Sequence, residues 1–119
     1  MKKIFLILIM LCGFSISNAE ISYISESSSW YKQYDGSGKQ KRSFSTSNGK
    51  LVGYSSHYYI LKDNSWYKIY NENGTMVRSL SISSIGKIIS VTESGFVAET
   101  SSWINFYNFN GNKISSRSK

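Results

Sequence analysis

The chain has 119 residues, including fourteen Lys and Arg, seven Asp and Glu, one His, one Cys and no Pro. The formal charge of +7 is that of a moderately basic surface, which argues against a dedicated nucleic-acid-binding arm. A single Cys excludes a framework of internal disulfides, and it leaves few ligands for a zinc site.

The first nineteen residues are typical of a secretory signal peptide. Two lysines precede an apolar run over residues 4–14, and the small residues Ser17 and Ala19 suit cleavage after Ala19. The run is shorter than the roughly 18 to 20 residues that cross a bilayer. We therefore expect a periplasmic or secreted protein, residues 20–119, with no stable membrane insertion after cleavage.

The expected mature chain forms a single domain without cysteine, because Cys12 is removed with the signal peptide. It keeps twelve basic and seven acidic residues, a balance of +5. An exported domain of this size without disulfides is stabilised by packing or by assembly, so we expect a homo-oligomer.

Three copies of one repeat follow the signal peptide. Their expected bounds are 20–47, 48–84 and 85–119. Each copy contains one tryptophan, and Trp30, Trp66 and Trp103 are spaced by 36 and 37 residues. A serine precedes each tryptophan, a tyrosine follows four residues later, and Asp or Asn comes next, with Gly three residues further on. Self-similarity at a fixed spacing is the signature of a repeat architecture.

Each full repeat is expected to form four short antiparallel strands, bounded by Gly, Asn and Ser. In the middle copy we predict strands at Lys50–Ser55, Tyr58–Lys62, Trp66–Tyr70 and Thr75–Ile82. The first of these strands begins with the segment Gly49-Lys50-Leu51-Val52, which matches Gly86-Lys87-Ile88-Ile89 of the last copy, whereas its place in the first copy falls inside the signal peptide. The first repeat is therefore expected to lack one strand.

The third and fourth strands of each copy are expected to be joined by a hairpin turn. The turn sequences are Asp35-Gly36-Ser37-Gly38, Asn71-Glu72-Asn73-Gly74 and Asn108-Phe109-Asn110-Gly111. The first side chain can accept backbone hydrogen bonds, and the last glycine can adopt positive φ. A calcium loop would need several oxygen ligands at alternate positions, so we expect no metal and no cofactor.

The strand that starts at a tryptophan carries large side chains on both faces. Trp66, Lys68 and Tyr70 alternate with Tyr67 and Ile69, and successive side chains point to opposite faces of a strand. A sheet that needs cover on both faces suits stacked sheets, as in a β-propeller. The predicted fold is all-β, with three antiparallel, propeller-like blades; the alternative is a β-trefoil.

The repeated pattern [YF]-[IV]-x5-S-W-x3-Y-[DN]-x2-G resembles the repeats of bacterial secreted β-propeller-like proteins across essentially the whole mature chain. It is also similar to the shorter aromatic repeats of cell-wall-binding modules. The resemblance implies a protein that binds surfaces or sugars.

The aromatic columns supply the candidate ligand-binding residues. These are Trp30, Trp66, Trp103, Tyr31 and Tyr67. An aromatic face can stack on a sugar ring, whereas the same rings could instead form the core between sheets. Because the tryptophans recur in every copy, we favour core packing for them. If any of these rings are exposed and bind a ligand, Tyr31 and Tyr67 are better candidates than the tryptophans. Ile104 interrupts the tyrosine column in the last copy.

Basic side chains gather on the fourth strand of each copy. They are Lys39, Lys41, Arg42, Arg78, Lys113 and Arg117. Charges on an edge strand block aggregation, which is the explanation we favour. The alternative is a basic rim that attracts anionic partners. Nucleic acid is not an expected partner of an exported protein.

Catalytic motifs are missing from the sequence. His57 is the only histidine, the acids are scattered, and no Gly-x-Ser-x-Gly elbow is present. We expect His57 to be an exposed turn residue and the protein not to be an enzyme. The sequence thus predicts an exported binding module, possibly lectin-like, for an envelope or extracellular glycan or protein. The alternative is a structural subunit that completes a β-propeller by oligomerisation.

Overall fold

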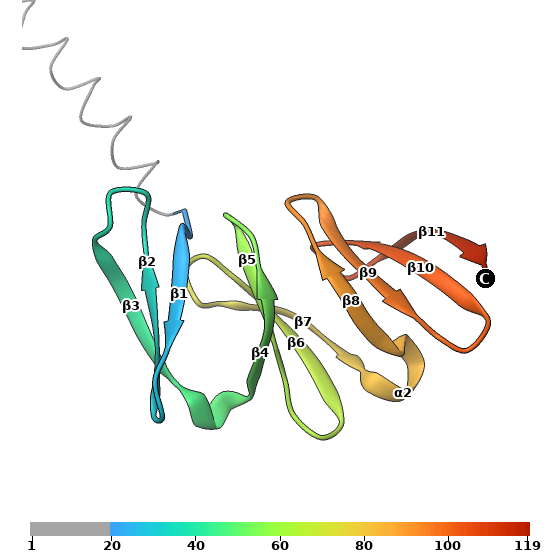
Figure 1. Cartoon of the computed structure of the whole chain (residues 1–119), viewed down its shortest axis with the longest axis horizontal. Coiled ribbons are helices and arrows are strands. Elements are labelled where there is room, and N and C mark those ends of the chain that lie inside the picture. Colours follow the sequence, from blue (N-terminus) through green and yellow to red (C-terminus); the bar gives the residue numbers. More distant parts are fainter. Residues whose placement is uncertain (1–19) are drawn as a thin grey trace, which may run out of the picture.

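The computed structural model describes residues 20–119, which form three antiparallel β-sheets in sequence order (Figure 1). The predicted signal peptide lies outside the described residues. Within residues 20–119, no helix has the length and apolar character needed to cross a membrane.

Each sheet is a meander of consecutive strands. The first sheet contains β1 (Tyr23–Glu26), β2 (Trp30–Tyr34) and β3 (Gln40–Ser45). The middle sheet contains β4 (Lys50–Tyr54), β5 (Tyr58–Lys62), β6 (Trp66–Asn71) and β7 (Met76–Ser81). The last sheet contains β8 (Lys87–Val91), β9 (Gly95–Glu99), β10 (Trp103–Asn108) and β11 (Lys113–Ser118). A 3₁₀ turn (Thr46–Asn48) and the short helix α2 (Ile82–Ile85) connect the sheets.

The all-β prediction is confirmed, and the four strands of the middle sheet agree with their predicted bounds to within one residue at each end. The first sheet has three strands in the described chain, as the repeat alignment predicts. The trefoil alternative is wrong, because a trefoil joins strands of different repeats in one barrel. Here no sheet within residues 20–119 contains strands of two repeats.

The predicted hairpin turns form for the expected physical reason. Asn71 Oδ1 accepts hydrogen bonds from the backbone N–H groups of Asn73 and Thr75, both at 3.0 Å. Gly74 then adopts φ 83°, a conformation that costs little without a Cβ. The turns at 35–38 and 108–111 repeat these bonds and the positive φ.

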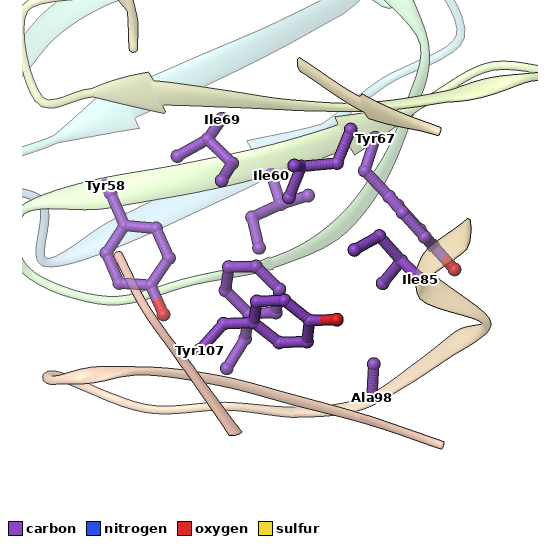
Figure 2. Close-up of a cluster of buried hydrophobic side chains, with 9 residues drawn as sticks. Tyr58, Ile60, Tyr67, Ile69, Ile85, Ala98 and Tyr107 are labelled. Atoms are coloured by element: carbon purple, nitrogen blue, oxygen red, sulfur yellow. The ribbon is translucent and has the colours of Figure 1, made fainter. Parts of the chain in front are cut away.

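The sheets pack face to face, and the core lies between them. Figure 2 shows the cluster between the middle and last sheets, where side chains of β5 and β6 meet side chains of β9 and β10. Its buried members are Tyr58, Ile60, Tyr67, Ile69, Leu80, Ile85, Phe96, Ala98 and Tyr107. A second cluster joins the first and middle sheets through Ile21, Ile24, Tyr31, Phe44, Tyr59 and Leu61. The middle sheet is thus covered on both faces.

The first strands of the two four-stranded sheets lie side by side. Gly53 of β4 faces Val91 of β8 so closely that a Cβ at residue 53 would lie 2.7 Å from the valine side chain. The fourth strands, β7 and β11, are the opposite edges of their sheets. In each of these two sheets, the first strand is the edge near the other sheet's first strand, and the fourth strand is the far edge.

Candidate functional site

The three tryptophans lie at equivalent, exposed positions, one in each sheet. Trp30, Trp66 and Trp103 are 48%, 46% and 48% exposed. The expectation that they form the core is wrong. Each tryptophan is the first residue of its strand and directly follows a hairpin turn.

The two tyrosines that were the better candidates for exposed ligand platforms are buried, Tyr31 at 1% and Tyr67 at 3%. The Tyr67 hydroxyl donates to the carbonyl oxygen of Gly86 at 2.8 Å and accepts from the N–H of Ile88 at 3.3 Å. Tyr31 makes the equivalent bonds to residues 49 and 51 of the middle sheet. These tyrosines join one sheet to the next, so they are not ligand platforms.

Each tryptophan is held by a polar side chain three residues earlier, a column that the sequence reasoning missed. The backbone N–H of Trp66 donates to Asp63 Oδ1 at 2.8 Å. Trp30 and Trp103 donate in the same way to the hydroxyls of Ser27 and Thr100, at 3.2 and 3.1 Å. The signal was present in the sequence as Ser, Asp and Thr at one offset, but these residue types look unrelated until their shared acceptor oxygen is considered.

The turn before Trp66 is also fixed electrostatically. The Asp63 carboxylate accepts from the backbone N–H groups of Ser65 and Trp66, and these bonds hold its pKa below the ordinary value. Lys68 contributes a weaker effect in the same direction from 3.3 Å. The carboxylate is therefore ionised at neutral pH and keeps the turn and the start of β6 in place.

Two serine residues neighbour each tryptophan along the chain and across the sheet. One serine precedes each tryptophan in the chain, and a second serine lies directly opposite it on the neighbouring strand. The opposite pairs are Trp30 with Ser45, Trp66 with Ser81, and Trp103 with Ser118. A hollow of about 380 Å³ is lined by Asn64, Ser65, Ser81, Ile82 and Ser83, which include both serines that neighbour Trp66, although the indole itself is not part of its lining. Each sheet thus presents an aromatic face beside hydroxyl groups, and we call these three positions the tryptophan edge.

The basic residues divide into two groups. Lys39, Lys41, Lys113 and Arg117 are exposed beside or on the edge strands β3 and β11. Arg42 instead lies between sheets, where it donates to Gln33 Oε1 at 3.1 Å and to the Tyr59 hydroxyl at 3.4 Å. Arg78 is exposed but reaches Asn112 Oδ1 of the last sheet at 2.6 Å. These two arginines therefore tie sheets together.

His57 is exposed in the turn after β4, as expected. Its Nδ1 lies 3.1 Å from Glu72 Oε2, and its Nε2 lies 3.8 Å from Glu20. In the part of the chain that the structure describes, no group of three or more His, Cys, Asp or Glu side chains is arranged to hold a metal ion. The contact with Glu20 links the turn after β4 to the segment that precedes the first sheet.

Comparisons of the chain with protein-family models, with curated proteins and with solved structures gave no match.

Proposed function

We propose that this protein is an exported, non-enzymatic binding module that recognises a glycan through the tryptophan edge. The observation that carries the proposal is the recurrence of one half-exposed indole in each sheet, flanked by serine hydroxyls. Single exposed rings are common on protein surfaces, but the repetition of one half-exposed indole at the same position of each sheet indicates a shared role.

The chemistry of the edge suits a sugar. An indole offers a flat apolar face that packs against the C–H face of a pyranose ring. The serine hydroxyls can both donate and accept, so they complement the hydroxyl groups around that ring. Three equivalent positions on one chain also allow a polysaccharide to bind several weak sites at once, which raises its overall affinity.

The architecture that we propose for this module is a set of propeller-like blades. Each four-stranded sheet runs in sequence order from a first strand beside its neighbour to an outer fourth strand. Stacking of such sheets supports the blade interpretation. We also propose export to the periplasm or the extracellular space, on the basis of the signal-like first nineteen residues.

The test is binding of the purified protein to an array of polysaccharides and peptidoglycan fragments, followed by titration of the best ligand. We expect Trp66→Ala to weaken binding by about tenfold, from loss of a stacking contact of about 1–3 kcal/mol. The triple variant at residues 30, 66 and 103 should abolish binding.

Phe109→Ala is the matched control, because Phe109 is also an exposed ring, 40% exposed, but lies in a hairpin turn outside the tryptophan edge. Its affinity should equal that of the unchanged protein. Equal affinity of the Trp66→Ala variant, or the absence of any glycan ligand, would contradict the proposal.

A further inference from the structure

We propose that two copies of this chain associate head to tail, with the open face of the last sheet of one copy packed against the open face of the first sheet of the other. The N-terminal face is the surface of the first sheet formed by Tyr23, Ser25, Lys32 and Tyr34, and Trp30 lies at the end of the same face. The C-terminal face is the surface of the last sheet formed by Val97, Ile104, Phe106 and Arg117. Both faces point away from the middle sheet.

The N-terminal face repeats a surface that is buried at the two junctions within the chain. Tyr59 and Tyr70 stack with their centroids 5.0 Å apart, and Phe96 and Tyr107 do the same at 5.0 Å. In both pairs the first ring is covered by the preceding sheet, with Tyr59 2% and Phe96 1% exposed.

Tyr23 and Tyr34 form the corresponding ring pair of the first sheet, at 6.3 Å. No preceding sheet covers this pair within residues 20–119, and Tyr23 is 55% exposed. The N-terminal face thus presents the surface that accepts a sheet elsewhere in the same molecule.

The C-terminal face is equivalent to the face of the middle sheet that packs against the last sheet. Val97 and Phe106 are opposite each other, as Ile60 and Ile69 are in the middle sheet. Ile60 and Ile69 are fully buried against the last sheet, whereas Val97 and Phe106 remain partly exposed. An apolar surface equivalent to an internal packing face is therefore left open on the last sheet.

The residue at position 104 departs from the repeat in a way that suits contact between the C-terminal face and the N-terminal face. Tyr31 and Tyr67 each place a buried hydroxyl on the start of the next sheet's first strand. The equivalent residue of the last sheet is Ile104, and the first sheet has no such first strand among the described residues. A tyrosine at 104 would bury an unpaired hydroxyl against the N-terminal face, and isoleucine avoids that cost.

Charge and aromatic chemistry complete the match. Arg117 is opposite Ile104, in the register position where Phe44 covers the ring of Tyr59 at 4.8 Å. The same placement at the new junction sets the Arg117 guanidinium over Tyr23, a favourable cation–π contact.

An acidic group lies beside that ring. Asp35 is buried, and its Oδ2 has no hydrogen-bond partner within the described chain. This side chain lines a hollow together with Tyr23 and Tyr34. An arginine arriving from the second copy would bring positive charge to this part of the N-terminal face.

On the propeller-like architecture proposed above, the usual number of blades favours an assembly of two copies. A head-to-tail contact repeats until the ring closes, and propellers usually have four to eight blades. Each chain contributes three sheets, so two chains give six, while three chains would exceed that range. The same junction then occurs twice, related by two-fold symmetry.

The first test is the solution mass of the purified exported protein across a concentration range. We expect two chains per particle. Tyr23→Glu and Arg117→Glu should each raise the dissociation constant at least about tenfold while leaving the circular dichroism spectrum unchanged, because both side chains are exposed.

Lys113→Glu is the matched control for Arg117→Glu, with the same charge change on the same strand. Lys113 is opposite Tyr107, on the face toward the middle sheet, so its dimer should persist. A monomer at all concentrations, or a dimer that survives both Tyr23→Glu and Arg117→Glu, would overturn the proposal.

Cross-linking tests the orientation of the two copies. Residues 20–119 contain no cysteine, so Tyr23→Cys and Arg117→Cys introduce unique thiols. A mixture of the two single variants should form a disulfide-linked dimer, whereas neither variant alone should. Efficient cross-linking within either single variant would show like faces in contact and would contradict a head-to-tail dimer.

Discussion

At two places in this chain, one tyrosine hydroxyl joins a sheet to the next sheet. Tyr67 reaches from the third strand of the middle sheet to residues 86 and 88 of the last sheet, and Tyr31 does the same toward the middle sheet. In each case the oxygen donates to a carbonyl group and accepts from a backbone N–H. The first strand of a sheet is thus positioned by a side chain of the preceding sheet.

Tyr67→Phe tests this role. The variant keeps the buried ring but removes two hydrogen bonds, so we expect a loss of about 1–3 kcal/mol in the free energy of unfolding. Urea unfolding followed by circular dichroism measures the change. Tyr70→Phe is the control, since the Tyr70 hydroxyl makes no hydrogen bond in the described part of the chain, and it should change stability by much less. Equal stability of Tyr67→Phe and the unchanged protein would contradict the assignment.

The candidate residues could be found from the sequence, but their exposure could not. Alternation along β6 correctly separates Trp66 from Tyr67. It does not say which face meets a neighbouring sheet fully, because that depends on how far the sheets overlap. The serine opposite each tryptophan was missed for a related reason, since the fifteen-residue offset has meaning only once the strand register is known.

At the scale of elements, hydrogen bonds to a glutamate connect the turns of two neighbouring sheets. Glu93, in the turn between β8 and β9, accepts hydrogen bonds from the hydroxyl and the backbone N–H of Ser56, in the turn between β4 and β5. The Ser56 hydroxyl is the largest cause of a Glu93 pKa below its ordinary 4.5, and the charge of His57 adds to it. The ionised carboxylate therefore favours the folded arrangement.

This tie predicts a pH dependence. A carboxyl group whose pKa is lowered by folding stabilises the protein above its ordinary pKa, and it loses that contribution as the pH falls through the folded value. We expect the melting temperature to fall between about pH 5 and pH 3. In Glu93→Gln the fall should be smaller and the melting temperature at pH 7 lower. A Glu93→Gln variant with an unchanged pH profile would show that Glu93 makes no contribution.

At the scale of the whole molecule, much of the fold is encoded in local signals. The turn residues and the alternation of side chains predict the strands, since each turn needs a short polar side chain and a glycine at fixed positions. The stacking of the sheets depends on contacts between residues far apart in the sequence, such as Arg42 with Tyr59. Arg42 reads as a surface charge in the sequence, because nothing local indicates that a ring and an amide lie beside it.

The most direct test of the central claim, that the tryptophan edge binds a glycan, is intrinsic fluorescence. The chain has three tryptophans, and all three belong to the edge, so the emission reports on the proposed site alone. Iodide should quench the free protein, because about half of each indole is exposed. Saturation with the glycan identified by the array should shift the emission to shorter wavelength and protect it from iodide. A glycan that binds without changing the emission or the quenching would contradict the claim.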